Sequence, residues 1–352
     1  MSRWARDREA AADALIGRSL EALDLSGRIL IANAAGGLPA MLAERGVACQ
    51  RWDRRLGYDG LARPWPPSGP FDLAIVRLAK AKDEQEMTAH AALSVLAPRA
   101  QLLLYGGNDE GIRSAAAVLA ELCGPVDTIA KRGHGRVLAG RRPAQLAHLR
   151  HDLAAWRRLG RLSIAGEARP WVTYPGLFAA GQIDAGTALL LGTLPSLPAG
   201  AHVADFGCGS GVIGAALAHK AAENPAQDLA MAGDGNRAIH LDLIDHDSIA
   251  LLAAQENVPG ARVILGTSLR QAKAGRYDAI FSNPPLHVGL SESHAALEAL
   301  VREAPQHLRQ GGCLHIVLQR RLAVERLLAA HFAQVCVVAD NGRYRVWQAR
   351  RG

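Results

Sequence analysis

Apolar runs of five or six residues alternate with amphipathic segments along the first half of the chain. The apolar runs predict strands over Arg28–Asn33, Phe71–Val76 and Gln101–Tyr105. The amphipathic segments predict helices over Leu38–Glu44, Glu84–Leu96 and Ile112–Leu122. Strands that alternate with helices in this way predict a mostly parallel sheet covered by helices on both faces.

The second half continues this alternation. A strand over Ala201–Phe206 leads through a glycine-rich turn into a helical segment that begins at Val212, and a later strand covers Tyr277–Ser282. The last two apolar runs, Val335–Val338 and Tyr344–Trp347, predict a strand pair at an antiparallel edge. Both halves therefore have the pattern of a doubly wound α/β fold.

With 352 residues, 49% of them hydrophobic, the chain is long enough to bury more than one core. We expect a first domain over residues 1–145, a linker over 146–170 with a helix around Leu146–Leu159, and a second domain over 171–352.

The glycine-rich turn has the sequence Asp205-Phe206-Gly207-Cys208-Gly209-Ser210-Gly211. Gly207 and Gly209 permit positive φ and let a ligand approach the backbone, and the following helix offers free N–H groups. Asp205 would repel a pyrophosphate but suits a cationic ligand such as S-adenosylmethionine. The alternative is an ordinary strand-to-helix turn, because glycine spacing alone is a weak signal.

A second cofactor element should be an acidic residue that closes the next strand and binds the ribose hydroxyls. We predict Asp245 for this role, with Asp242 and Asp247 as the alternatives, because an apparent inserted loop makes the spacing ambiguous. Ser268, after the following strand, is a candidate for contact with the adenine.

The strand over Tyr277–Ser282 ends at Asn283-Pro284-Pro285-Leu286. The two prolines fix φ and remove two backbone donors, so a stiff loop presents an amide side chain and several carbonyl acceptors. A planar NH2 group is what such acceptors would hold, which predicts a site that binds an amine.

From about Thr173 to Arg350 the chain resembles the class I S-adenosylmethionine-dependent methyltransferases of the Asn-Pro-Pro type, and more narrowly the ribosomal small-subunit methyltransferase C family. Four elements carry the resemblance: Thr173–Phe178 with Ile183–Thr187, Asp205–Gly211, Ser282–Gly289 and Gly342–Trp347. In the first half, Phe71–Leu73, Lys80–Lys82 and Gly111–Ala115 are similar to the N-terminal domain of that family.

The resemblance implies two Rossmann-like methyltransferase domains, of which the first is degenerate and serves RNA docking or folding. Asn33–Gly37, at the place of the glycine-rich turn, lacks its acidic residue and glycine spacing. The implied activity is methyl transfer from S-adenosylmethionine to the N2 amine of a guanine in 16S rRNA, so the partner is 16S rRNA or the 30S subunit.

The resemblance also implies the roles of individual residues. The expected catalytic residues are Asn283, Pro284 and Pro285. The expected cofactor-binding residues are Asp205, Gly207, Cys208, Gly209, Gly211, Asp245, Ser268 and Asn283. The expected substrate-binding residues are Leu286, His287, Phe178 and Asp184.

One position departs from the family pattern, because Leu286 stands where an aromatic residue usually follows the two prolines. An aromatic ring there would stack on an extruded base, which contributes about 1–3 kcal/mol. Either Phe178 or Trp347 supplies the missing aromatic ring, or the protein binds the extruded base more weakly. His287 matches the family pattern, although a loop histidine is also compatible with a solvated or structural role.

Charge and cysteine content are compatible with this interpretation. Residues 1–160 hold 23 Lys and Arg against 17 Asp and Glu, a net charge of +6 out of +7 for the chain. Such an excess attracts phosphates, although a solvated arginine-rich surface would look the same. Five cysteines in no metal-ligand spacing, no long apolar run and a charged N-terminus predict a cytoplasmic protein without metal or membrane. We also expect a monomer.

Other functions use the same two acceptors, the Asn283 side-chain oxygen and the Pro284 carbonyl. A guanine in 23S rRNA, a release-factor glutamine or a DNA adenine are alternative substrates, and a cofactor-binding rRNA assembly factor with little turnover is the non-enzyme alternative. A protein substrate would not need the basic first half, and no separate DNA-recognition region is visible.

Overall fold

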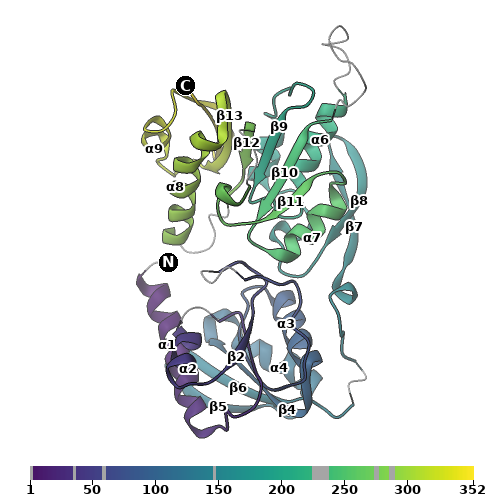
Figure 1. Cartoon of the computed structure of the whole chain (residues 1–352), viewed down its shortest axis with the longest axis vertical. Coiled ribbons are helices and arrows are strands. Elements are labelled where there is room, and N and C mark those ends of the chain that lie inside the picture. The colour runs from purple at the N-terminus through teal and green to yellow at the C-terminus, as the bar shows by residue number, and fades with distance from the viewer. Residues whose placement is uncertain are drawn as a thin grey trace. The chain divides into compact units, whose positions relative to one another are not determined.

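The structure is a computed structural model that describes residues 3–34, 37–57, 61–145, 148–223, 238–272, 277–284 and 290–352. The chain forms two compact units, Met1–Arg157 and Arg158–Gly352 (Figure 1). The prediction of two α/β domains is confirmed. The boundary between the two units, at Arg157 and Arg158, lies within residues 146–170, where the linker was expected.

The first unit is built on a six-stranded sheet of order β2-β1-β3-β4-β6-β5, in which β6 runs antiparallel to the other five strands. Its strands are β1 (Ile29–Ala32), β2 (Cys49–Trp52), β3 (Phe71–Arg77), β4 (Leu96–Gly107), β5 (Asp127–Arg132) and β6 (Gly135–Arg141). Its helices are α1 (Arg3–Ser19), η1 (Leu20–Ala22), α2 (Gly37–Glu44), α3 (Lys82–Val95), η2 (Asn108–Glu110), α4 (Ile112–Cys123) and η3 (Ala154–Trp156).

The second unit has a seven-stranded sheet of order β11-β10-β9-β12-β13-β15-β14 and a separate hairpin, β7 with β8. The strands are β7 (Arg158–Ile164), β8 (Glu167–Thr173), β9 (His202–Phe206), β10 (His240–Asp245), β11 (Arg262–Leu265), β12 (Tyr277–Ser282), β13 (Leu308–Gln319), β14 (Gln334–Asp340) and β15 (Tyr344–Arg350). The helices are η4 (Phe178–Gly181), α5 (Ala185–Leu191), α6 (Val212–Glu223), α7 (Ser248–Asn257), η5 (Leu269–Ala272), α8 (Leu290–His307) and α9 (Glu325–Ala329).

The two sheets have the same topology apart from one additional strand in the second. If β11 is left out, the strands of the second sheet follow the same order as those of the first, and the antiparallel strand occupies the same place. Asp72 in β3 and Asp278 in β12 make the same contact, since each carboxylate accepts the backbone N–H of Arg28 or His202 at 2.8 Å. The duplicated fold expected from the sequence is therefore observed.

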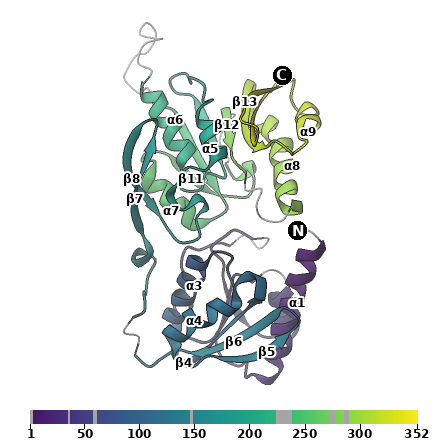
Figure 2. The same cartoon turned by 180° about the vertical axis from the view of Figure 1, so that it is seen from behind.

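Successive side chains of a central strand point to opposite faces of the sheet and pack in different hydrophobic cores. Because both faces are buried, these strands are apolar throughout. In β1, Ile29 and Ile31 pack with residues of α1 and α2, whereas Leu30 and Ala32 pack with residues of α3 and α4. Helices cover both faces of the second sheet in the same way (Figures 1 and 2).

The helix expected over Leu146–Leu159 is wrong in its described part. Only the short η3 forms there, and the chain then enters the β7–β8 hairpin. The two strands are joined by Ala165 and Gly166, which both have positive φ (53° and 85°), as a tight hairpin turn requires. Figure 2 shows the hairpin beside α6 and α7, so it belongs to the second unit.

In the described residues, no helix is both long and apolar enough to cross a membrane.

Two buried histidines have pKa values below the usual range. His315 in β13 is 3% exposed and stacks on Phe281 of β12, with ring centroids 4.7 Å apart. Burial, and to a lesser extent the charge of Arg350, lowers the pKa of His315 to about 4. His90 in α3 has its pKa lowered to about 4 by burial and by the charges of Arg150 and His151.

We expect acid to destabilise the protein through these groups. Below about pH 6.5 the unfolded chain binds a proton at His315, whereas the folded chain keeps this side chain neutral down to about pH 4. The contribution of His315 to the free energy of unfolding is therefore complete above about pH 6.5 and is lost as the pH falls toward 4. Between pH 7.5 and 5.0, His315 alone should lower the free energy of unfolding by about 2 kcal/mol. Urea unfolding of His315→Phe should show a correspondingly weaker pH dependence, whereas exposed His331→Gln should match the wild type; equal pH dependence in all three proteins would contradict the assignment.

Candidate active site

The glycine-rich turn lies at the carboxyl end of β9, between that strand and α6. Gly207, Gly209 and Gly211 have φ of 73°, 53° and 92°, a backbone that other residues rarely adopt. A Cβ on Gly209 would meet open space, whereas a Cβ on Gly211 would lie 2.8 Å from Val258. The turn is therefore open on one side, where a ligand can approach the backbone, and tightly packed on the other.

Asp205 in β9 is fully buried beneath this turn. Its Oδ2 accepts the N–H of Gly214 at 3.1 Å, while its Oδ1 finds no donor among the described residues. Burial raises the pKa of Asp205; with the opposing effect of the Gly214 hydrogen bond and the further effect of the Asp245 charge, the pKa is about 7. A buried carboxylate oxygen without a donor suits a ligand that brings a donor or a positive charge, so this position fits S-adenosylmethionine.

Cys208 is buried within the turn. Burial and the neighbouring charges of Asp245 and Asp205 raise the pKa of its thiol well above the usual range. The neutral thiol form of Cys208 is therefore favoured.

Asp245, the residue predicted to bind the ribose, contacts the glycine-rich turn. Its Oδ2 accepts the N–H of Gly209 at 2.9 Å, and its Oδ1 accepts the N–H of Asp247 at 2.9 Å. Burial alone would raise the pKa of Asp245, but contacts with His246 and the backbone N–H groups of Asp247 and Gly209 lower it overall. The carboxylate thus stays charged at the carboxyl end of β10.

The two other aspartates have structural contacts. Asp242 accepts from Arg262 at 2.8 and 2.5 Å and from the Tyr277 hydroxyl at 2.5 Å. Asp247 caps α7 by accepting the N–H of Ile249 at 3.0 Å. These contacts favour Asp245 over both alternatives.

Asn283 follows β12 at the same edge of the sheet. Parallel pairing places Ser282 opposite Phe206, and the Ser282 hydroxyl donates to the Phe206 carbonyl at 2.7 Å. The Asn283 Nδ2 donates to Thr187 Oγ1 at 2.8 Å and to Asp184 Oδ2 at 3.2 Å. Among the described residues none donates to its Oδ1. Pro284 is buried.

Asp184, expected to contact the substrate, is turned toward α5 and Asn283. It caps α5 by accepting the N–H groups of Gly186 at 2.9 Å and Thr187 at 3.2 Å, and the Thr187 hydroxyl at 2.5 Å. Sequence reasoning noticed Asp184-Ala185-Gly186-Thr187 but gave Thr187 no role; the signal was an N-cap residue followed three positions later by a hydroxyl.

The remaining predicted residues have mixed outcomes. Phe178 in η4 is 54% exposed, whereas Trp347 is 6% exposed and packs in a core of the second unit, so Phe178 is the more accessible of the two aromatic rings. The Ser268 hydroxyl donates to Glu303 of α8 at 2.5 Å and accepts the N–H of Arg270 at 3.1 Å. Pro285, Leu286 and His287 lie outside the described residues.

The β7–β8 hairpin, which the sequence analysis did not predict, is joined to the glycine-rich turn by hydrogen bonds. Trp171 donates to the Ser210 hydroxyl at 3.2 Å. Asn257 at the end of α7 accepts the N–H of Val172 at 2.8 Å and donates to the carbonyls of Val172 at 2.9 Å and Ser210 at 3.0 Å. A buried amide with three such bonds fixes the turn to the hairpin.

The corresponding positions of the first unit hold different chemistry. By strand register, Asp53 occupies the place of Asp245, and Arg77 that of Asn283. Asp53 pairs with Arg51 at 2.9 Å, and Arg77 pairs with Glu110 at 2.6 Å. The acceptor amide is replaced by a cation, which agrees with a copy that does not catalyse methyl transfer.

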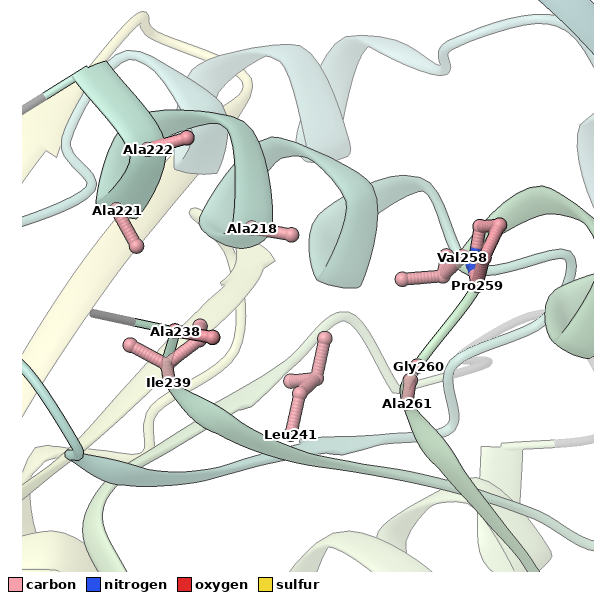
Figure 3. A pocket seen from close by; sticks show the side chains of 10 residues that line it. All are labelled: Ala218, Ala221, Ala222, Ala238, Ile239, Leu241, Val258, Pro259, Gly260 and Ala261. Carbon is pink, nitrogen blue, oxygen red and sulfur yellow. The ribbon is translucent and has the colours of Figure 1, made fainter. Parts of the chain in front are cut away.

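A pocket that Figure 3 shows lies elsewhere. Apolar residues from the end of α6, the start of β10 and the α7–β11 turn line it, among them Ala218, Leu241 and Val258. It lies toward the amino ends of β10 and β11, whereas Asp245 is the last residue of β10 and Asn283 follows β12, so it is not part of the candidate site. Within the described ranges no group of three or more metal-ligating side chains occurs.

Known proteins resemble this chain over nearly its whole length. The family "Methyltransferase small domain" matches residues 169–348, and "Methyltransferase small domain N-terminal" matches residues 20–156. The ribosomal RNA small subunit methyltransferase C of Ectopseudomonas mendocina is 32% identical over 89% of this chain and 86% of that protein. The protein of the same name from Stutzerimonas stutzeri is 30% identical over 93% and 95%.

Among solved structures, the 16S rRNA N2 G1207 methyltransferase of T. thermophilus, in complex with AdoMet and guanosine, has a TM-score of 0.81. The similarity covers 97% of this chain and 92% of that one at 23% sequence identity. This likeness confirms the fold of both units.

Proposed function

Because this chain belongs to the ribosomal RNA small subunit methyltransferase C family, we propose that it transfers a methyl group from S-adenosylmethionine to the exocyclic N2 amine of a guanine in 16S rRNA. The observation that carries the proposal is the Asn283 amide, which is anchored through its nitrogen and has its oxygen available beside the glycine-rich turn.

Residues at the carboxyl edge of the second sheet would hold the cofactor, which supplies an activated methyl group when bound. Gly207 and Gly209 leave room for it against the backbone, and the charged Asp245 suits the ribose hydroxyls. The buried Asp205, whose Oδ1 has no donor among the described residues, favours the positively charged part of the ligand.

The amine would be held by acceptors at the end of β12. Its two N–H bonds need two acceptors, and the Asn283 Oδ1 and the Pro284 carbonyl supply them. Holding both hydrogens directs the nitrogen lone pair away from the protein toward the methyl donor and stabilises the positive charge that develops on nitrogen. The proton can leave to water afterwards, so no strong base is required.

Contact with RNA is proposed for the first unit, where two arginines converge on one amide. The guanidinium Nε atoms of Arg136 and Arg113 donate to the Asn108 Oδ1 at 2.8 and 3.3 Å, and Lys131 and Arg132 are exposed at the end of β5. Guanidinium groups held in this way suit phosphate oxygens, and their contribution should depend on salt.

We expect the double variant Arg113→Gln and Arg136→Gln to bind 16S rRNA more weakly, with a slope of log affinity against log salt that is shallower by about 2. Filter binding across a salt series measures this slope. The charge-matched pair Arg302→Gln and Arg321→Gln, on the second unit, should change the slope less. Equal changes in both pairs would show that overall charge, rather than this surface, drives binding.

The proposed reaction is tested by methyl transfer from labelled S-adenosylmethionine to 30S subunits, naked 16S rRNA, 23S rRNA, DNA and release factor. Incorporation into 16S rRNA, followed by nucleoside mass spectrometry that identifies N2-methylguanosine, is expected. Labelling of 23S rRNA, adenine or glutamine instead would overturn the substrate assignment. No labelling of any substrate would favour a cofactor-binding assembly factor.

A further inference from the structure

The polar groups around Asn283 come from two segments nearly 100 residues apart and form a closed network. The Thr187 hydroxyl donates to Asp184 Oδ2 at 2.5 Å, and the Asn283 Nδ2 donates to Thr187 Oγ1 at 2.8 Å and to Asp184 Oδ2 at 3.2 Å. Asp184 and Thr187 are both buried or half-buried, so bulk water competes weakly for these bonds.

This network determines which way the Asn283 amide faces. A hydroxyl has one proton, and that of Thr187 is committed to the Asp184 carboxylate, which only accepts. The Thr187 oxygen can therefore only accept from Asn283, and the amide must turn its NH2 group toward α5. Its carbonyl oxygen is directed away from α5 as a consequence.

We propose that Asp184 and Thr187 are positioning residues that fix the orientation of the Asn283 amide and strengthen its oxygen as an acceptor. The inference rests on the proposed role of Asn283 as the acceptor for the substrate amine. Donation to a carboxylate polarises the amide, so its oxygen binds an N–H group more strongly. With the NH2 group facing α5, the same side chain offers no donor to a carbonyl on the substrate, which selects for an amine.

The position of α5 is itself fixed by packing. Asp184 caps the helix, and a Cβ on Gly186 would lie 3.4 Å from the ring of Tyr344 in β15. The close approach of Gly186 to Tyr344 connects the Ile183–Thr187 segment to the Gly342–Trp347 segment. The Ile183–Thr187 segment thus binds the Asn283 amide, and the Gly342–Trp347 segment packs against the start of α5.

The inference is tested with Thr187→Val, which keeps the shape of the side chain but removes the hydroxyl, and with Thr187→Ser, which restores it. Thr187→Val should lower kcat for 16S rRNA methylation about 10- to 100-fold, with the Kd for S-adenosylmethionine and the melting temperature close to wild type. Thr187→Ser should recover kcat to within about threefold of the wild type. Asp184→Asn, which keeps an acceptor for capping α5, should lower kcat by at least about tenfold.

A double-mutant cycle distinguishes positioning from general packing. The Thr187→Val change should have no further effect in an Asn283→Ala background, because Thr187 acts through Asn283. Thr193→Val, which removes a hydroxyl bonded to the Leu190 carbonyl at 2.8 Å just beyond α5, is the matched control and should leave kcat unchanged.

Several outcomes would overturn the inference. Wild-type kcat in Thr187→Val would do so, as would parallel losses of kcat, cofactor affinity and melting temperature in both Thr187→Val and Asp184→Asn. If Asn283→Ala is inactive while Thr187→Val is fully active, only the positioning role fails. If Asn283→Ala itself retains transfer, the proposed role of Asn283 fails as well.

Discussion

Asn283→Ala is expected to lower methyl transfer to 16S rRNA by about 10³-fold while S-adenosylmethionine still binds within a fewfold of the wild-type Kd. Removing one preorganised group that stabilises charge in a transition state typically costs about 10²–10³ in kcat, and Asn283 also orients the amine. The alanine variant leaves the Thr187 hydroxyl and Asp184 paired with each other, so α5 keeps its cap. Single-turnover transfer of labelled methyl groups measures the chemical step, and equilibrium dialysis measures cofactor binding.

A second substitution at this position controls for simple loss of bulk. Asn283→Asp keeps the size and one acceptor oxygen, but it brings a second carboxylate to within hydrogen-bonding distance of Asp184, where the amide donates now. We expect Asn283→Asp to be as inactive as Asn283→Ala. Equal loss of transfer and cofactor binding in the alanine variant would indicate misfolding and would count against catalysis by Asn283.

Asp245→Ala is expected to weaken S-adenosylmethionine binding by about 100-fold, which corresponds to about 2.7 kcal/mol. The substitution removes the carboxylate proposed to bind the ribose. It also leaves the N–H groups of Gly209 and Asp247 without their side-chain acceptor, so the glycine-rich turn loses part of its support. Isothermal titration calorimetry with S-adenosylmethionine measures the change.

The neighbouring aspartates provide matched controls. Asp242→Ala leaves Arg262 and Tyr277 without their acceptor and should lower the melting temperature more than it changes cofactor affinity. Asp247→Ala removes the cap of α7 and should cost about 1 kcal/mol of stability. If Asp242→Ala or Asp247→Ala weakened cofactor binding more than Asp245→Ala at equal stability, the ribose assignment would move to that residue.

Local patterns were sufficient for most of the strands and for the turns that carry the site. The runs over Phe71–Val76 and Tyr277–Ser282 correspond to β3 and β12, because buried parallel strands are apolar throughout. A helix was expected over residues 146–159, which are rich in Leu, Ala and Arg, a composition that favours helices, and the β7–β8 hairpin that begins at Arg158 was missed. Its strands are stabilised by packing of Trp171 in the core and by Asn257, a contact 85 residues distant in sequence.

The sequence by itself determined the alternation of strands and helices in both halves, the glycine-rich turn after β9 and the place of Asn283 after β12, since each depends on residues adjacent in the chain. It could not separate Asp245 from Asp242 and Asp247, because three carboxylates within six positions differ only in which distant groups they meet. The tertiary structure favours Asp245, because Asp242 is paired with Arg262 and Tyr277 and Asp247 caps α7. It alone also brought Thr187 to Asn283, 96 residues away, because strand register and helix packing, not local pattern, decide which side chains meet.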